Sequence, residues 1–226
     1  MEHVLDNPAW NALISGNRHL SYGTEQVRYF DEEVSPFVAF KENNEESFDL
    51  LYGLLTHNRP VLLVTPMETE IPGQWKVLQI RKGLQMVYDV NEEQYEVHGE
   101  LVPLTDEHVP QMLALVKLTN PGPFESRTIA FGHYYGIFEG DKLLAMAGQR
   151  LHVFDYAEVS AVCTHPDHTG KGYAKQLLQH QIKRIKATSG VPFLHVRHDN
   201  ERAINVYERL GFSTRREVYF YAMLKA

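Results

Sequence analysis

Residues 169–174, Thr-Gly-Lys-Gly-Tyr-Ala, form the pattern in this chain with the clearest chemical meaning. They follow residues 158–164, which are rich in β-branched and small side chains and predict a strand. Pro166 should end that strand because it has no N–H for the ladder, and a helix should begin at about Tyr173. A strand that leads through glycines into a helix can hold phosphate. Backbone N–H groups converge there, and the helix N-terminus carries roughly half a positive charge.

The two common nucleotide-binding loops fit this turn poorly. A P-loop has a further glycine upstream of its Gly-Lys pair and a Ser or Thr after it, whereas this chain has His165 and Gly172 at those positions. A dinucleotide fingerprint has a third glycine three residues after the second, where this chain has Lys175. The turn therefore indicates a different phosphate ligand.

Composition and charge exclude several classes of protein. The 226 residues carry a net charge of −7, which argues against a general nucleic-acid binder with a basic face. No run approaches the roughly 18–20 apolar residues of a membrane span, and the first residues show no secretory signal. Cys163 is the single cysteine, so no intrachain disulfide can form. We therefore expect a cytoplasmic protein without membrane or nucleic-acid partners.

Two other kinds of site, a thiol nucleophile and a metal site, are less consistent with the sequence. Cys163 could be a thiol nucleophile, but it alternates with Val159 and Ala161 on a face expected to be buried, which favours a small hydrophobic role. The twelve histidines could bind metal, but with the nearest carboxylates and thiol they form no closed ligand spacing, so no metal site is expected. These histidines include His165, His168, His195 and His198.

The first 95 residues predict a small α/β domain without a catalytic motif. Phe48, Leu51, Leu54 and Leu55 have helical spacing. A short helix is also expected within 7–20, and strands at 28–40, 61–64, 75–80 and 84–88, the last two separated by residues 81–83. Residues 91–99 are acidic and polar, and we place the domain join there, giving domains 1–95 and 96–226.

The second domain contains the glycine turn within an alternation of strands and helices. Strands are expected at 100–104, 134–138, 142–153, 158–164, 193–196 and 217–224, and helices at 105–118, 126–131, 173–188 and 200–210. Asn200 should cap the last helix, and Gly211 should follow it in the left-handed conformation. Both halves read strand–helix–strand–strand, which is consistent with a degenerate internal duplication.

Two motifs in this order resemble the GNAT superfamily of acetyl-CoA-dependent N-acetyltransferases. The pyrophosphate loop of that family, Gln/Arg-x-x-Gly-x-Gly/Ala, is similar to residues 169–174, with Thr169 departing from the usual first residue. A second family motif is matched by Asn200, Ala203, Tyr207 and the Gly-Phe pair at 211–212. The resemblance covers roughly the last 130 residues. It implies an α/β (α+β) fold, a mixed, largely antiparallel sheet flanked by helices, with the first half a degenerate GNAT-like repeat.

The resemblance also implies how acetyl-CoA would be bound. The pyrophosphate would lie on Thr169, Gly170, Lys171, Gly172, Tyr173 and Ala174. The pantetheine arm would pair with the strand edge at Val162, Cys163 and Thr164, where two strands splay apart, and Asn200 would also contribute. No metal is implied.

A direct transfer to an amine needs a base, an acid and an oxyanion donor. An alkylamine with a pKa near 10 must lose a proton before it attacks. The resemblance implies that Glu158 is the base that accepts this proton, with Asp155 and His152 as alternatives. Glu158 should share a strand face with Ser160, Val162 and Thr164. Tyr207 would protonate the leaving thiolate, and a backbone N–H near Val162 would meet the oxyanion.

The sequence therefore predicts transfer of an acetyl group from acetyl-CoA to a primary amine, either a small molecule or a peptide. The glycine N-acyltransferase-like branch is a similar neighbour, since it too joins a front half without a motif to such a domain. Two alternatives stay open at this stage: an acyltransferase for longer acyl-CoA, and a non-catalytic CoA-binding regulatory module. The acceptor pocket and the oligomeric state follow from loops and surfaces that sequence patterns do not define.

Overall fold

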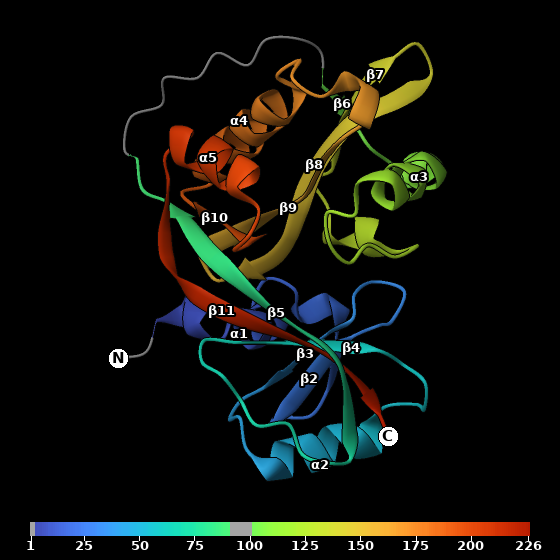
Figure 1. Ribbon diagram of the computed structural model, residues 1–226, viewed down its shortest axis with the longest axis vertical. Coiled ribbons are helices and arrows are strands. Elements are labelled where there is room, and N and C mark those ends of the chain that lie inside the picture. The colour runs from blue at the N-terminus through green and yellow to red at the C-terminus, as the bar shows by residue number, and fades with distance from the viewer. Residues whose placement is uncertain (1–2, 91–100) are drawn as a thin grey trace.

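The computed structural model describes residues 3–90 and 101–226, and their strands form one eleven-stranded sheet (Figure 1). Its strand order is β6-β7-β8-β9-β10-β5-β11-β4-β3-β2-β1. The strands are β1 (Ser21–Gly23), β2 (Val27–Phe30), β3 (Phe37–Phe40), β4 (Val61–Thr65), β5 (Trp75–Tyr88), β6 (Val102–Pro103), β7 (Tyr135–Glu139), β8 (Lys142–Val153), β9 (Tyr156–Thr164), β10 (Val191–Arg197) and β11 (Phe212–Lys225). This mixed sheet flanked by helices confirms the predicted fold class.

Ten helices lie within the described residues. The α-helices are α1 (Pro8–Ile14), α2 (Glu45–Leu54), α3 (Val109–Thr119), α4 (Tyr173–Lys186) and α5 (Glu201–Arg209). The short 3-10 helices are η1 (Val4–Asp6), η2 (Arg18–Leu20), η3 (Asp106–His108), η4 (Thr128–Phe131) and η5 (Pro166–His168). None of the helices in this described part is both long and apolar enough to cross a membrane.

Two long central strands connect the halves of the molecule. β5 and β11 pair in antiparallel fashion from Tyr88 opposite Phe212 to Trp75 opposite Lys225, and in Figure 1 both extend between the upper and the lower part of the molecule, in opposite directions. The predicted break at residues 81–83 is therefore wrong, because β11 pairs with β5 straight through that segment. The predicted domain join lies in residues 91–100, outside the described residues, so the division at residue 95 stays a prediction.

The two halves have matching arrangements around this central pair. In the first half, β3 and β4 are parallel with α2 between them in sequence; in the second, β9 and β10 are parallel with α4 between them. The next strand beside β4 is β11, from the second half, while the next strand beside β10 is β5, from the first. The predicted internal duplication is compatible with this exchange of strands and stays a prediction.

Different helices cover the two faces of the sheet in the second half. α4 packs against β8, β9 and β10, and its predicted apolar residues Leu177, Leu178, Ile182 and Ile185 are buried. We call this the helix face; α5 also contributes to its core. The opposite face packs against α1, α3 and the first half, and we call it the junction face. Because each face has its own core, a side chain's face decides which ligand it can reach.

A bulge in β9 changes which residues share a face. Ala161 has a φ of 52°, and Ala161 and Val162 together oppose the single residue Ala147 of β8. An extra residue of this kind shifts the alternation along the strand by one. Val159 accordingly packs in the helix-face core, whereas Ala161 and Cys163 pack in the junction-face core. The predicted alternation of Cys163 with Val159, and of Glu158 with Val162 and Thr164, is therefore wrong beyond the bulge.

Candidate functional site

The glycine turn adopts the geometry that its sequence predicts. Gly170 and Gly172 have φ values of 81° and 82°, in the left-handed region that favours glycine, and α4 begins directly afterwards at Tyr173. A Cβ added at either glycine would meet nothing within 4 Å. The glycines are thus required by backbone conformation, and the space beside them is open for a ligand.

The N-terminus of α4 has the features of an anion site. Its cap residue Gly172 provides no side-chain cap, so the first N–H groups of the helix lack the usual partner. The exposed Lys171 Nζ lies 3.1 Å from His168 Nδ1, and Thr169 Oγ1 donates to the carbonyl of Pro166 at 3.1 Å. Free N–H groups, the positive end of the helix dipole and a lysine together favour bound phosphate oxygens.

β9 and β10 separate immediately beyond Glu158. Their parallel pairing extends from Tyr156 to Glu158 on β9, opposite 191–193 on β10, although β9 continues to Thr164 and β10 to Arg197. The buried Thr164 Oγ1 makes no hydrogen bond within the described residues. The predicted splay is present, and it leaves an edge of β9 with polar groups that an amide-rich ligand could meet.

Tyr207 lies on the helix face beside this gap. It packs in the same core as Val162 and its ring lies 6.1 Å from that of Phe212. Burial, together with the neighbouring Cys163, raises the pKa of Tyr207 to about 12, so the phenol stays protonated at neutral pH. A protonated hydroxyl beside the gap can donate a proton to a leaving group there.

Cys163 lies on β9 beyond the point where β9 and β10 separate, but it is a poor nucleophile. It is buried, and its Sγ–H donates to the carbonyl of Ala161 at 3.1 Å. Burial raises the pKa of the thiol to about 12, so the reactive thiolate is scarce at neutral pH. The predicted role as a small buried side chain agrees with this environment.

Glu158 is completely buried at the point where the strands separate. Arg150 donates to it through Nε to Oε2 at 2.9 Å and through Nη2 to Oε1 at 2.6 Å. The Leu151 N–H lies 3.3 Å from Oε2, and His195 Nδ1 lies 2.7 Å from Oε1. Burial alone would raise the pKa of Glu158, but the charge of Arg150 and the contacts with Arg150 and His195 hold it well below its usual range. A charged carboxylate with four donors cannot take a proton directly from an amine without losing these partners.

The hydrogen-bond chain continues from His195 into the first half. Gln85 Nε2 lies 3.1 Å from His195 Nε2 and donates to the carbonyl of Leu5 at 2.9 Å, while Gln85 Oε1 accepts from Arg215 Nη1 at 2.8 Å. Because the amide oxygen is occupied by Arg215, the amide nitrogen faces His195. This arrangement assigns the histidine proton to Nδ1 and leaves the Nε2 lone pair facing the amide. Arg215 in turn donates to Asp6 at 2.6 Å.

The two alternative bases lie at the far end of β9. His152 and Asp155 flank the hairpin between β8 and β9, and the Asp155 carbonyl accepts from the Val191 N–H at the start of β10. The strands are still paired there, because they separate only beyond Glu158. The gap that could admit a substrate therefore does not reach either alternative.

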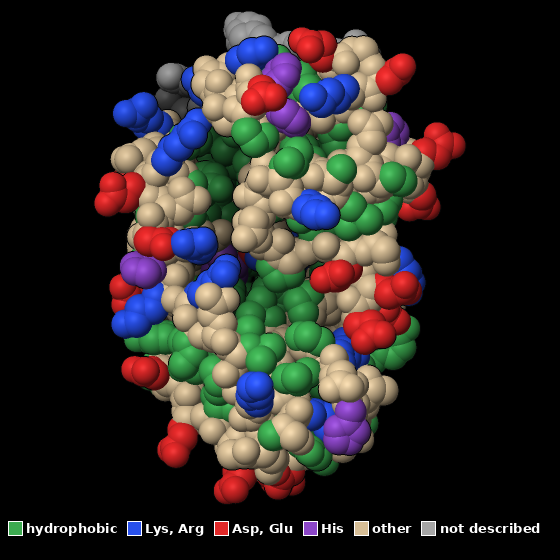
Figure 2. Space-filling model, turned by 45° about the vertical axis from the view of Figure 1, so that its right-hand side comes forward, with side chains coloured by type: hydrophobic (Ala, Val, Ile, Leu, Met, Phe, Trp, Pro, Cys, Tyr) green, Lys and Arg blue, Asp and Glu red, His purple; other side chains and the backbone are tan. Residues whose placement is uncertain are grey.

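A pocket of about 340 Å³ opens on the junction face beside this cluster. We call it the junction pocket. Its lining comes from both halves of the molecule: Phe37, Leu62, Gln79, Arg81, Asn120, Pro121, Gly122, Pro123, Arg150, His195, Val196, Arg197, Phe220 and Ala222. The face drawn in Figure 2 is hollowed near its middle, and Lys and Arg side chains lie at the edge of that hollow. The glycine turn and the junction pocket thus belong to opposite faces of one sheet, at the place where two of its strands separate.

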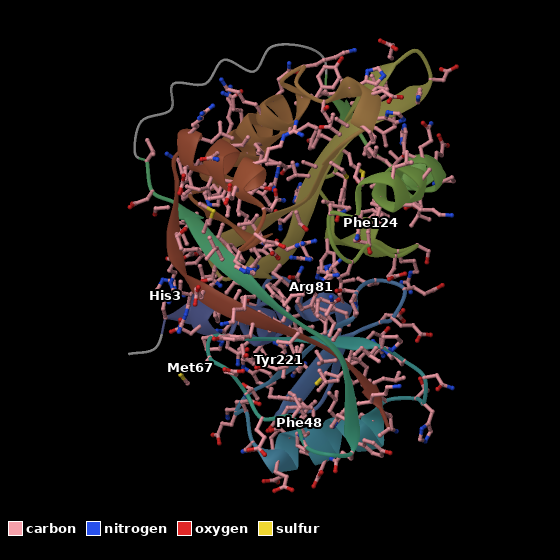
Figure 3. All side chains as sticks on the ribbon, viewed as in Figure 1. His3, Phe48, Met67, Arg81, Phe124 and Tyr221 are labelled. Carbon is pink, nitrogen blue, oxygen red and sulfur yellow. The ribbon has the colours of Figure 1, made fainter. Side chains whose placement is uncertain are left out.

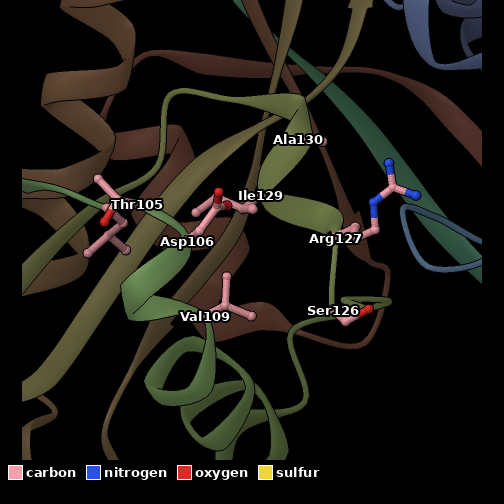
Figure 4. A pocket seen from close by; sticks show the side chains of 8 residues that line it. Thr105, Asp106, Val109, Ser126, Arg127, Ile129 and Ala130 are labelled. Atoms are coloured by element: carbon pink, nitrogen blue, oxygen red, sulfur yellow. The ribbon is translucent and has the colours of Figure 1, made fainter.

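A second depression of about 690 Å³ lies between the start of α3 and η4 (Figure 4). Its lining includes Asp106, Val109, Arg127 and Ile129. None of the predicted site residues lines it, so we assign it no role. Within the described residues, no group of three or more His, Cys, Asp and Glu side chains is arranged to hold a metal ion.

The sequence predicts the glycine turn, Tyr207 and Glu158 as site residues, and these stay predictions, but it does not indicate the partners of Glu158. Arg150 lies across the β8–β9 hairpin, so a hairpin register would have indicated it, although the bulged pairing hides the register in the sequence. His195 lies on β10, next to β9, and no local pattern marks it. Arg81 is on β5 and enters the pocket only because β5 inserts beside β10.

Comparisons with known proteins agree with this geometry. The family model described as FR47-like protein matches residues 134–221. The N-alpha-acetyltransferase RimI of Mycobacterium tuberculosis is 34% identical over 84 residues, which are 35% of this chain and 51% of that protein. The chain thus aligns with about half the length of this curated relative.

Solved structures resemble the whole chain. A putative acetyltransferase from the GNAT family of Novosphingobium aromaticivorans is 33% identical, with 100% of both chains covered and a TM-score of 0.92. A GCN5-related N-acetyltransferase from Kribbella flavida is 15% identical, with 95% of each chain covered and a TM-score of 0.61. The second likeness concerns the fold alone, whereas the first covers sequence and fold together.

Proposed function

Because this chain belongs to the GNAT family of acetyltransferases, we propose that it transfers an acetyl group from acetyl-CoA to a primary amine in one direct step. The observation that carries the proposal is the joint placement of an uncapped, glycine-led helix N-terminus and a strand pair that separates beyond Glu158. A pyrophosphate fits the first feature and an amide-containing arm fits the second. Both features come from this chain's own backbone.

The glycine turn, the β9 edge and the residues near them fit acetyl-CoA. The glycines at 170 and 172 leave open space beside free N–H groups. The orphaned Thr164 Oγ1 and the bulge at Val162 offer polar groups along the β9 edge for the pantetheine amides. Acetyl-CoA, when bound, supplies the activated thioester; Cys163 and Asn200 would stand near it, although Asn200 Oδ1 already accepts from the Ala203 N–H at 3.2 Å.

We propose that His195 is the base that accepts the proton of the attacking amine. Of the side chains that line the junction pocket, the three guanidinium groups have no acceptor atom, whereas the ring of His195 offers a nitrogen lone pair at Nε2. The Nε2 lone pair would take the proton in place of the hydrogen bond from Gln85, and Glu158 would stabilise the imidazolium through Nδ1 at 2.7 Å. Glu158 then acts as a positioning residue and no longer as the direct base that the sequence predicted.

The proton balance is completed by Tyr207. As the amine nitrogen forms its bond to the acetyl carbon, the carbon–sulfur bond breaks and the thiolate needs a proton. Tyr207 carries a proton at neutral pH, as any phenol does, and burial raises its pKa further, to about 12; the side chain lies beside the gap on the helix face. A backbone N–H at the β9 bulge near Val162 would meet the oxyanion.

The first experiment is a thermal-shift titration with acetyl-CoA, run beside CoA, ATP and NAD. Binding to the folded state alone stabilises the protein by about 2.7 kcal/mol at a hundredfold excess over Kd. We expect a shift with acetyl-CoA and CoA but not with ATP or NAD. Gly172→Ala should weaken acetyl-CoA binding at least about tenfold, because a left-handed φ disfavours alanine and the methyl group projects into the open space.

The matched control is Gly140→Ala, in the β7–β8 turn. Gly140 also has a positive φ, 57°, and open space around it, but it belongs to a hairpin rather than to the cofactor loop. It should show the same backbone strain with acetyl-CoA binding unchanged. Equal loss of binding in both variants would contradict the assignment of the loop.

Transfer itself is tested by thiol release with a panel of small amines and peptide N-termini. We expect release that depends on an amine and on acetyl-CoA. Faster release from longer acyl-CoA would favour the acyl-chain alternative, and binding without release from any amine would favour a regulatory module. A small-molecule or peptide amine acceptor and a cytoplasmic location remain parts of this proposal.

A further inference from the structure

The junction pocket contains a cationic group without a counter-charge, and we propose that it binds the carboxylate of the amine acceptor. Arg81 is the residue that makes this contact and so selects the substrate. The inference rests on the proposed function, because it names the class of amine: one that also carries a carboxylate. Figure 3 places Arg81 near the middle of the molecule, where the central strands pass between the two halves.

The charges around the pocket leave one positive charge unbalanced. Among the described residues, no Asp or Glu lines the pocket. Of its three arginines, Arg150 is neutralised by Glu158, and Arg197 forms an ion pair with Asp199 at 2.6 Å. The side chain of Arg81 makes no hydrogen bond or ion pair with any described residue, although its backbone pairs with β11. The lining therefore has a net charge of about +1, which matches one carboxylate, although the whole chain is acidic.

The sheet register directs Arg81 toward the same space as His195. Arg81 lies opposite Phe220 of β11, while His195 of β10 lies opposite Gln85 of β5. Arg81 and Gln85 are four residues apart on β5, so their side chains leave the same face of the strand. The backbone separation is about 13 Å at 3.3 Å per residue. An acceptor that reaches from His195 toward Arg81 therefore carries its amine and its carboxylate at different ends of the molecule.

The walls of the pocket suit the body of such a molecule. Phe37 and Phe220 contribute aromatic surface, and the Phe220 ring lies edge-on at 5.6 Å from the ring of His195. A volume of about 340 Å³ is at the lower end of the range for small-molecule sites, which excludes a large folded acceptor from the pocket itself. The geometry thus fits an apolar linker with an amine at one end and a carboxylate at the other.

The experiment compares ω-amino acids of increasing length with their carboxamides. The probes are glycine, β-alanine, 4-aminobutyrate and 6-aminohexanoate, each beside its amide, and kcat/KM is measured by thiol release from acetyl-CoA. We expect at least one carboxylate to be preferred over its amide at least about tenfold, as for a charge-assisted hydrogen bond. Arg81→Gln should abolish that preference by raising KM for the carboxylate to about the KM for the amide.

The control removes a neighbouring charge that does not face the pocket. Lys82 follows Arg81 on β5, does not line the pocket, and lies 5.2 Å over the ring of Tyr219. Lys82→Gln should keep the preference for the carboxylate. If it removes the preference as fully as Arg81→Gln does, the effect is one of overall charge and the assignment to Arg81 is overturned.

A second readout separates this inference from the proposed function. Calorimetry measures binding of the same four carboxylates to the protein with CoA, without turnover. Carboxylate binding that is lost in Arg81→Gln supports the pocket assignment even if no amine is acetylated, an outcome that would count against the proposed function alone. Acetylation of acids and amides at equal rates, or no carboxylate binding up to millimolar concentrations, overturns the pocket assignment.

Discussion

Replacing Glu158 by glutamine should destabilise the fold through Arg150. The change removes the negative charge to which Arg150 donates two hydrogen bonds and which His195 contacts. The Arg150 side chain, which is only 11% exposed, is then left without a counter-charge. Breaking a buried ion pair by removing one partner costs about 3–5 kcal/mol. With an unfolding entropy of roughly 2.1 cal/mol/K per residue over 226 residues, this corresponds to a Tm lowered by about 6–10 °C.

The assay is urea unfolding at pH 7, followed by far-UV circular dichroism, for wild type, Glu158→Gln and the double variant Glu158→Leu with Arg150→Met. The double variant removes both charges, so it should recover much of the loss, because a buried pair replaced by apolar side chains of similar volume is often nearly neutral. Turnover of each variant is then expressed per folded molecule. A Glu158→Gln variant within about 1 kcal/mol of wild type would refute the buried-pair reasoning.

The pH dependence gives an independent check with a defined sign. The folded-state pKa of Glu158 lies below its unfolded value of about 4.3, so the stabilisation is present above that pH and is lost as the pH falls toward the folded pKa. The stability difference between wild type and Glu158→Gln should therefore be constant from pH 6 to 7 and shrink below about pH 4.3. A difference that stays constant down to pH 3 would contradict the assignment of the shift to Glu158.

Three further predictions concern single side chains. Tyr207→Phe should lower kcat at least about tenfold with little change in acetyl-CoA binding by thermal shift, because only the proton donor is lost; full activity would contradict the acid role. Cys163 should react with iodoacetamide far more slowly in the native protein than in urea, as mass spectrometry would show, because burial raises its pKa to about 12. Thr128→Val should lower the free energy of unfolding, measured by chemical denaturation, by about 1–3 kcal/mol, because the buried hydroxyl donates to the Val34 carbonyl at 2.7 Å across the two halves. Thr188→Val, at an exposed position, is the matched control.

Local patterns in the sequence were sufficient to predict the backbone of the glycine turn and the ends of the helices near it. The glycines at 170 and 172 require positive φ, and the apolar spacing of α4 places its N-terminus directly after them. Asn200 caps α5 through the Ala203 N–H, and Gly211 has a φ of 99° after that helix, both as predicted. These features depend on contacts within a few residues, which is why sequence spacing determines them.

The lining of the junction pocket depends on contacts between segments that are distant in the sequence. The sequence predicts a break in β5 at residues 81–83, but pairing with β11 keeps the strand continuous. Its position beside β10 places Gln85 opposite His195 and brings Arg81 into the lining of the same pocket. The bulge at Ala161 likewise reverses the faces of the residues that follow it. Neither event leaves a local signal, because each arises from the register between strands.

The sequence alone therefore determined the family-like order of elements, the glycine turn before α4 and the helix that carries Tyr207. The tertiary structure decided that Glu158 is a buried partner of Arg150 and His195, and that the pocket beside them has one unbalanced positive charge. The physical reason is burial: the charge state and the role of a carboxylate depend on which groups replace its water, and those groups come here from β8 and β10, which sequence spacing does not bring together.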